Sequence, residues 1–279
     1  MDVPLPLAGA RRRGWRLVMA VAAANTPATA SLPQVRHIRF SDLWEALRAG
    51  VRDFRAIPSQ AIFLCLIYPL VGLFLWSLMV RYDVLPLLFP LVAGFALVGP
   101  FAAVGLYELS RRREVGLDSE WLHAFDVFRS PAKWSIFALA VLLLVIFGAW
   151  LGTARAIYLQ TMGDTPIVSP VNFVDRVLTT HAGHMLIILG NGIGFLFAVV
   201  TLAVAVVSFP LVLDRKVDAP TAIITSVRAV LASPMQMLAW GFIVAAILVA
   251  GSIPFLFGLA IAMPVLGHAT WHLYRRVVV

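Results

Sequence analysis

The sequence predicts an all-α polytopic membrane protein with six transmembrane helices, arranged as three hairpins that each follow a cytoplasmic amphipathic interfacial helix. Apolar residues make up 61% of the 279 residues and charged residues only 13%, against about 45–50% and about 25% in soluble domains. Uncharged apolar runs also recur along the chain. This composition excludes an ordinary soluble domain and extensive disorder. The single cysteine, Cys65, excludes a disulfide framework and a cysteine-based metal centre.

The apolar runs define six predicted spans, because a bilayer core about 30 Å thick needs about 20 helical residues. These runs are residues 59–80, 84–109, 133–159, 184–213, 235–253 and 255–274. The last two are treated as separate because residues 235–274 in one helix would measure about 60 Å. Gly251-Ser252-Ile253-Pro254, at the midpoint, combines helix-breaking residues. Residues 37–279 are therefore expected to form one six-helix transmembrane domain.

The distribution of basic residues predicts the orientation. If the N-terminus is cytoplasmic, the inner segments 1–58, 110–133, 214–234 and 275–279 contain 19 of the 22 lysines and arginines. Cytoplasmic loops carry such an excess, so both termini are predicted to be cytoplasmic. The net charge of +8 is then a signal of topology and not of nucleic-acid binding. The expected partner of the inner face is a lipid bilayer with anionic headgroups.

Residues 1–36 are predicted to form a disordered basic tail. They contain Arg11-Arg12-Arg13, Arg16 and a short apolar run, residues 17–24. These features faintly resemble a signal peptide. Cleavage after such a peptide would place the basic residues from Arg36 to Arg55 outside, against the charge rule, so a tail is the preferred interpretation.

Three inner segments share one design, an amphipathic helix that ends at a proline. They are residues 42–57, 119–130 and 221–233, followed by Pro58, Pro131 and Pro234. The first segment has one apolar helical face and a separate stripe of Arg48, Arg52 and Arg55. These helices are expected to lie in the inner interface, or to pack against the cytoplasmic ends of the spans. A similarity between residues 94–112 and 258–276 adds to the pattern and favours an internal repeat.

Two segments are distinctive: Pro264-Val-Leu-Gly-His268-Ala-Thr-Trp271-His272-Leu-Tyr-Arg-Arg276, and Asp42-Leu-Trp-Glu-Ala-Leu before the first span. They resemble a family of proteobacterial inner-membrane proteins of unknown function that cross the membrane six times. The resemblance covers about residues 35–279. It implies the bacterial inner (cytoplasmic) membrane as the location and supplies no catalytic residue. Some members of the family carry a cytochrome c oxidase subunit label, which makes a respiratory complex one candidate membrane-protein partner.

Ionisable side chains are rare within the spans, and the few near the span ends are the candidate functional groups. His268 and His272 are four residues apart on one helix face, a spacing that can bind a metal or a haem. His123, on the same side of the membrane, is a third candidate. One interpretation pairs Glu108 with His272, both pointing inward. The simpler interpretation makes all four interfacial polar residues, so no metal or cofactor is predicted.

Asn191 lies between Gly190 and Gly194 in the fourth span. Two glycines four residues apart favour close helix packing, with the amide hydrogen-bonding across the contact. The alternative is a flexible break that lines a polar cavity, as in transporter helices. His181 and His184 begin this span on the outer side, where a metal site is the less favoured interpretation.

The sequence contains no combination of residues typical of a catalytic site, so the protein is not expected to be an enzyme. The leading hypothesis is a non-catalytic integral inner-membrane protein that acts as a scaffold or accessory subunit of a membrane complex. One alternative is a transporter or channel for a neutral or apolar solute. Another is an accessory or assembly factor of cytochrome oxidase.

Overall fold

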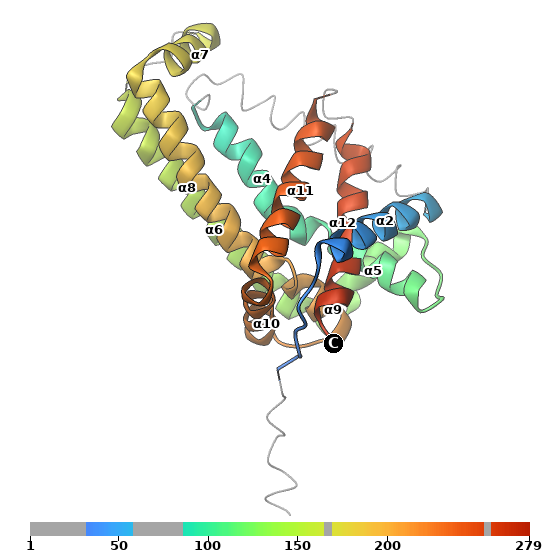
Figure 1. Cartoon of the computed structure of the whole chain (residues 1–279). Coiled ribbons are helices and arrows are strands. Elements are labelled where there is room, and N and C mark those ends of the chain that lie inside the picture. The colour runs from blue at the N-terminus through green and yellow to red at the C-terminus, as the bar shows by residue number, and fades with distance from the viewer. Residues whose placement is uncertain (1–31, 58–85, 165–168, 254–257) are drawn as a thin grey trace, which may run out of the picture. The chain divides into compact units, whose positions relative to one another are not determined.

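The computed structural model of the protein describes residues 32–57, 86–164, 169–253 and 258–279 (Figure 1). The first predicted span, residues 59–80, and the tail before residue 32 lie outside the described residues. Within the described ranges the regular elements are helices, and the extended pairing is one isolated antiparallel bridge between Val35 and Val278. Residues 34–36, assigned above to the tail, therefore pair with the C-terminal residues.

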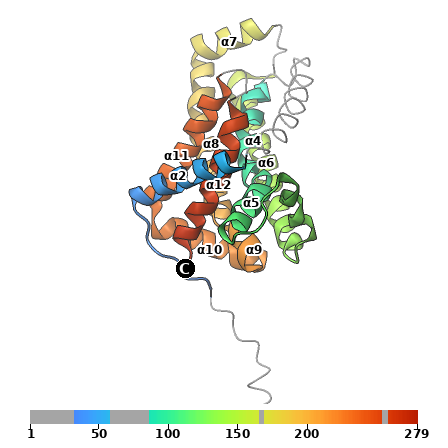
Figure 2. The ribbon, with the colours of Figure 1, turned by 90° about the vertical axis from the view of Figure 1, so that its right-hand side faces the viewer.

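The helices follow one another in the order of the chain. They are α2 (Phe40–Ala56), α4 (Leu88–Ala102), α5 (Val104–Glu114), the 3₁₀ helix η2 (Trp121–Arg129), α6 (Lys133–Met162), α7 (Pro170–Thr179), α8 (His181–Ala205), α9 (Ser208–Arg215), α10 (Ala219–Ala232), α11 (Pro234–Ser252) and α12 (Leu259–Val277). Figures 1 and 2 show α6 and α8 side by side, and α2 crossing α12. The all-helical class predicted from the sequence is confirmed for the described residues.

Three helices in the described ranges are long and apolar enough to cross a membrane, by length and composition. They are Lys133–Met162, His181–Arg215 and Pro234–Ser252, and they coincide with the predicted third, fourth and fifth spans. The predicted second span is divided between α4 and α5 at Ala103, shortly after Pro100, whose ring cannot continue the helical hydrogen bonds. The structure thus supports an all-helical protein with several candidate membrane-spanning helices.

Helices occupy the three positions predicted to be amphipathic. The first is α2, in which the Asp42 side chain accepts a hydrogen bond from the backbone nitrogen of Arg39 at 2.8 Å and so caps the first turn. Its apolar face packs against α12, so for this helix packing against another helix is the observed arrangement. The second forms a 3₁₀ helix and not an α-helix. The third is α10, which starts with a proline in its first turn.

The α2–α12 contact depends on a glycine. A Cβ at position 50 would lie 2.6 Å from the backbone nitrogen of Ala269 and 2.6 Å from the carbonyl oxygen of Val265. No side-chain carbon fits at that distance, so only glycine lets the two backbones approach this closely.

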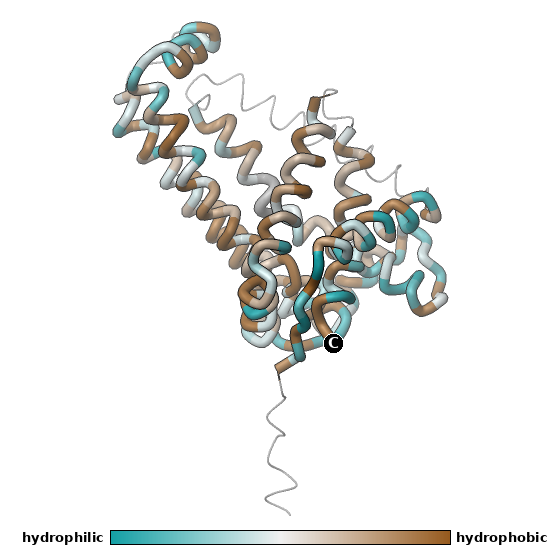
Figure 3. The backbone as a smooth tube through the Cα atoms, in the orientation of Figure 1, coloured by the Kyte–Doolittle hydropathy of each residue, from teal (hydrophilic) through white to brown (hydrophobic). Residues whose placement is uncertain are grey.

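The core lies at one end of the molecule, where α9, α10 and α12 meet α2 and α5. Its fully buried side chains include Trp271 and Tyr274 on α12, Phe209 and Leu211 on α9 and Leu109 on α5, and Trp240 on α11 and Leu139 and Leu143 on α6 join the same core. By contrast, α6, α8 and α11 expose large apolar side chains, among them Phe137, Leu144, Ile188, Leu196, Phe242 and Val249. Figure 3 shows these helices largely brown, with hydrophilic residues gathered on α2 and its neighbours. Exposed apolar surface of this extent is typical of contact with lipid.

Candidate functional site

A cluster of polar side chains joins α2, α5 and α12 inside this core. We call it the Asp53 cluster, and it consists of Asp53, Ser110, Arg113, His268 and His272. Asp53 lies on the buried face of α2, the face that also carries Leu43, Ala46 and Gly50. Ser110 and Arg113 are three residues apart on α5, and the two histidines are four residues apart on α12. Each pair therefore projects from one helix face.

Both oxygens of the Asp53 carboxylate have partners. The Ser110 hydroxyl donates to Oδ2 at 2.6 Å, and His272 Nε2 donates to the same oxygen at 2.8 Å. Arg113 forms an ion pair with Oδ1. Ser110 Oγ also lies 2.7 Å from His268 Nδ1, within hydrogen-bonding distance. The carboxylate thus fastens α2 to both α5 and α12.

The electrostatics of Asp53 follow from this geometry. Burial alone would raise the pKa of the carboxyl group, because it disfavours the charged form. The hydrogen bonds from His272 and Ser110 outweigh burial and hold the pKa of Asp53 below its usual value. The carboxylate is therefore ionised at neutral pH and can attract Arg113.

The cluster contains residue types that also occur in hydrolases, and two of its side chains are fully enclosed. Ser110 is 1% exposed and His268 is completely buried. Asp53 accepts the hydrogen bond of the serine hydroxyl. The residues that the structure describes contain no group of three or more His, Cys, Asp and Glu side chains that could hold a metal.

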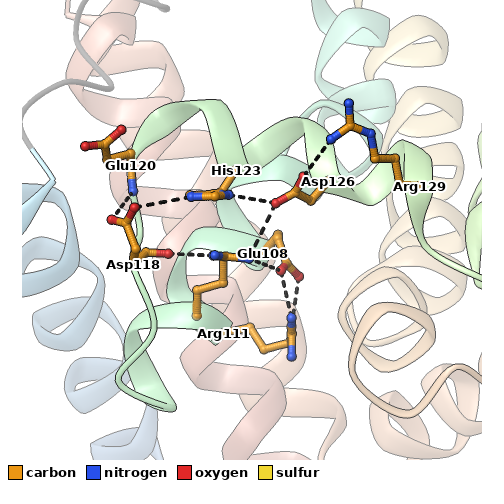
Figure 4. A network of polar contacts seen from close by, with 8 residues as sticks. Glu108, Arg111, Asp118, Glu120, His123, Asp126 and Arg129 are labelled. Atoms are coloured by element: carbon orange, nitrogen blue, oxygen red, sulfur yellow. Dashed lines mark hydrogen bonds and ion pairs between the residues drawn. The ribbon is translucent and has the colours of Figure 1, made fainter.

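The predicted pair of Glu108 and His272 does not form. Glu108 accepts hydrogen bonds from Arg111 Nε at 2.8 Å and from Arg111 Nη2 at 2.7 Å, on the next turn of its own helix (Figure 4). His272 instead binds Asp53. The two side chains therefore belong to different networks, because the face of α5 that carries Glu108 also carries Arg111 three residues later.

His123 does not join the histidines of α12. Its Nδ1 lies 2.8 Å from Asp126 Oδ2, and its Nε2 lies 3.3 Å from Asp118 Oδ2 (Figure 4). The hydrogen bond to Asp126 raises the pKa of His123, although Arg112 nearby opposes the shift. Arg112 in turn contacts Asp126 at 3.4 Å and donates to the backbone oxygen of Asp118. These contacts fasten η2 to α5.

The glycine and asparagine candidates lie in an unbroken part of α8. The Asn191 side chain donates to the carbonyl of Ile187, one turn earlier in the same helix, at 2.8 Å. A Cβ at Gly194 would lie 2.9 Å from the Trp150 ring, whereas a Cβ at Gly190 would meet no described atom within 4 Å. Gly194 therefore supports close packing with α6.

The sequence did not predict most of the polar contacts that join α12 to its neighbouring helices. The overlooked residues are Asp53, Ser110, Arg113, Glu114, Asp214, Arg275 and Arg276. Arg275 pairs with Glu114 and Asp214, and Arg276 pairs with Asp42 and Glu45. No local signal pointed to Asp53, because the large apolar residues Leu47, Val51 and Phe54 define a different face of this helix.

The comparisons with known proteins agree with a membrane location. Residues 88–214 match a family model described as "Predicted integral membrane protein (DUF2189)". The resemblance to an uncharacterised membrane protein family is thereby confirmed, and the matched segment runs from α4 to α9. Searches of curated proteins and of solved structures found no match.

Proposed function

We propose that this integral membrane protein is non-catalytic and acts as a scaffold or accessory subunit of a complex in the bacterial inner membrane, with both termini in the cytoplasm. One observation carries the proposal. The Asp53 cluster fixes one face of α2, while the opposite face exposes Arg48, Arg52 and Arg55. A rigidly held basic surface suits recognition of a partner.

The exposed arginines form a stripe along α2, because they are four and three residues apart. They form no ion pair with another described residue. Trp44, near the start of the same stripe, is also exposed. Arginine and tryptophan are enriched where proteins bind one another, so the proposed occupant is an acidic surface of a membrane-protein partner. Anionic lipid headgroups are the competing occupant.

The test compares purification from native membranes in a gentle detergent for three forms of the full chain. These are the wild type, the triple variant R48Q/R52Q/R55Q, and R228Q, which neutralises an exposed arginine on α10. We expect a stoichiometric partner with the wild type and R228Q, lost from the triple variant. A wild-type protein without a partner contradicts the proposal. If the triple variant loses only co-purified anionic lipid, headgroups occupy the stripe.

The two alternative functions give separate outcomes. Transport of a neutral solute through α8 requires N191L to abolish flux in proteoliposomes without loss of folding; the hydrogen bond of Asn191 to its own helix gives this alternative no support. An oxidase accessory role requires oxidase subunits or a haem band in the visible spectrum of the purified material. A colourless preparation from a strain with normal oxidase content excludes that role.

A further inference from the structure

The helix α7 was not anticipated from the sequence, and its surface is divided into two faces. It begins at Pro170, after Ser169, whose hydroxyl accepts a hydrogen bond from the backbone nitrogen of Asn172 at 3.2 Å. Val171, Val174 and Leu178 are 80%, 52% and 60% exposed. Their spacing of three and four residues places them on one ridge of the helix. The polar residues share the other side of the helix; they are Asn172, Asp175, Arg176 and Thr179.

The direction of this apolar ridge is fixed by the turn into α8. The Thr180 hydroxyl donates to the carbonyl of Arg176 at 2.6 Å and accepts from the backbone nitrogen of Gly183 at 3.0 Å, so one side chain caps both helices. A Cβ at Gly183 would lie 2.2 Å from the carbonyl oxygen of Val177. His184 Nε2 donates to the carbonyl of Leu178 at 2.8 Å. These bonds make α7 a rigid extension of α8.

The position of α7 indicates what covers the ridge. Figures 1 and 2 place it across the ends of α6 and α8 that lie away from the C-terminus. Both helices belong to candidate membrane spans, and their exposed surface is apolar, including Ile188 on α8 and Leu144 on α6. The inner side of α7 packs on α6 through Phe173, whose ring centroid is 6.2 Å from that of Tyr158. The exposed ridge therefore lies at the end of two candidate spans whose own exposed surface is apolar.

We propose that α7 is an interfacial helix, which lies in the bilayer leaflet at this end of the molecule and inserts Val171, Val174 and Leu178 among the lipid acyl chains. Amphipathic helices bind the headgroup region in this way. Asp175 and Arg176 balance each other in charge, so zwitterionic lipid is sufficient. The proposal is independent of the scaffold function, since it requires only that α6 and α8 cross the membrane.

The test measures the depth of single labelled positions in the full chain. All variants carry Cys65→Ala, which removes the single native cysteine. Val174→Cys and Leu178→Cys report on the ridge, Asn172→Cys is the matched control on the polar face, and Leu144→Cys on α6 is the reference for a candidate span. Each variant is labelled with an environment-sensitive fluorophore and reconstituted in phosphatidylcholine nanodiscs. Doxyl groups at shallow or deep acyl positions quench from the lipid, and iodide quenches from water.

We expect shallow doxyl lipid to quench the labels at positions 174 and 178 several-fold more than the label at 172, which iodide quenches instead. Deep doxyl lipid should quench the label at 144. Equal iodide quenching at 172, 174 and 178 would overturn the proposal, because α7 would then stand in water. Ridge labels shielded from both quenchers would also overturn it and would identify a protein as the occupant. A label at position 144 that deep doxyl lipid does not quench would place α6 outside the bilayer, and the premise that α6 crosses the membrane would then be wrong.

Discussion

Replacing Asp53 with alanine should release α2 from the rest of the protein without unfolding it. The carboxylate is the shared acceptor for Ser110 and His272 and the partner of Arg113. In D53A all three groups lose this acceptor together. The contacts of Arg276 with Asp42 and Glu45, and the apolar packing on α12, remain. We therefore expect local opening of α2.

The magnitude follows from how exposed each partner is. Leaving the buried Ser110 hydroxyl without its charged acceptor costs about 1–3 kcal/mol of stability. Losing the hydrogen bond to His272 costs a similar amount if water does not replace Asp53 as its partner. The side chains of His272 and Arg113 are 24% and 39% exposed. Water therefore recovers part of their loss, and the arginine pair contributes about 0–1 kcal/mol. The sum is about 3 kcal/mol, which corresponds to about a 100-fold change in the opening equilibrium.

Hydrogen–deuterium exchange of the full chain in detergent micelles near pH 7 measures this opening. Protection of the α2 amides should fall about 100-fold in D53A, while R52A, a substitution of the adjacent exposed arginine, should change it little. Folding lowers the pKa of Asp53, so its carboxylate stabilises the folded state fully above about pH 3.9, the pKa of an aspartate in the unfolded chain. This stabilisation is lost as the pH falls through the pKa of Asp53 in the folded state. Protection in D53A equal to that in R52A at pH 7 would refute the reasoning.

Two further predictions concern backbone approach and pH. Gly50→Ala should lower the free energy of unfolding by about 1–3 kcal/mol, because α2 must move away from the α12 backbone; Gly148→Ala, where no described atom is near the new methyl group, should be neutral or stabilising by thermal denaturation. Folding raises the pKa of His123, so the protonated ring stabilises the folded state fully below about pH 6.5, the pKa of a histidine in the unfolded chain. This stabilisation is lost as the pH rises through the pKa of His123 in the folded state. Exchange in η2 should therefore increase from pH 6 to 8 relative to other segments, an increase that H123Q should lack; an NMR titration of His123 at or below 6.5 would contradict this.

The helical class and several candidate spans could be predicted because they depend on composition and run length. Apolar runs such as 133–159 have the length of a bilayer crossing, and α6 occupies this segment. The helix α2 was also predicted, although it starts at Phe40, two residues before the predicted start at Asp42. These are local signals, and each is contained within one segment.

The Asp53 cluster could not be predicted because it depends on which helices pack together. Asp53 is 57 residues from Ser110 and 219 residues from His272, so no local pattern connects them. Glu108 was paired with His272 on the basis of an internal similarity, yet Arg111 was the nearer partner on the same helix. The short helix α7 was missed because its ten residues are too few to give a clear periodic pattern.

The contact between α2 and α12 also bears on how far the predicted sixth span extends. Gly50 meets α12 at Val265 and Ala269, while the outer face of α2 exposes Arg48 and Arg52. An arginine at the centre of a bilayer costs at least about 2.5–3.5 kcal/mol, so we expect α2 to lie outside the hydrocarbon core. We therefore expect the part of α12 from Val265 onward to lie at or beyond the interface, where the Asp53 cluster and the ion pairs of Arg275 and Arg276 are compatible with water. We expect the C-terminal half of α12 to support the surrounding helices, and the lipid-embedded part of this helix to end before it.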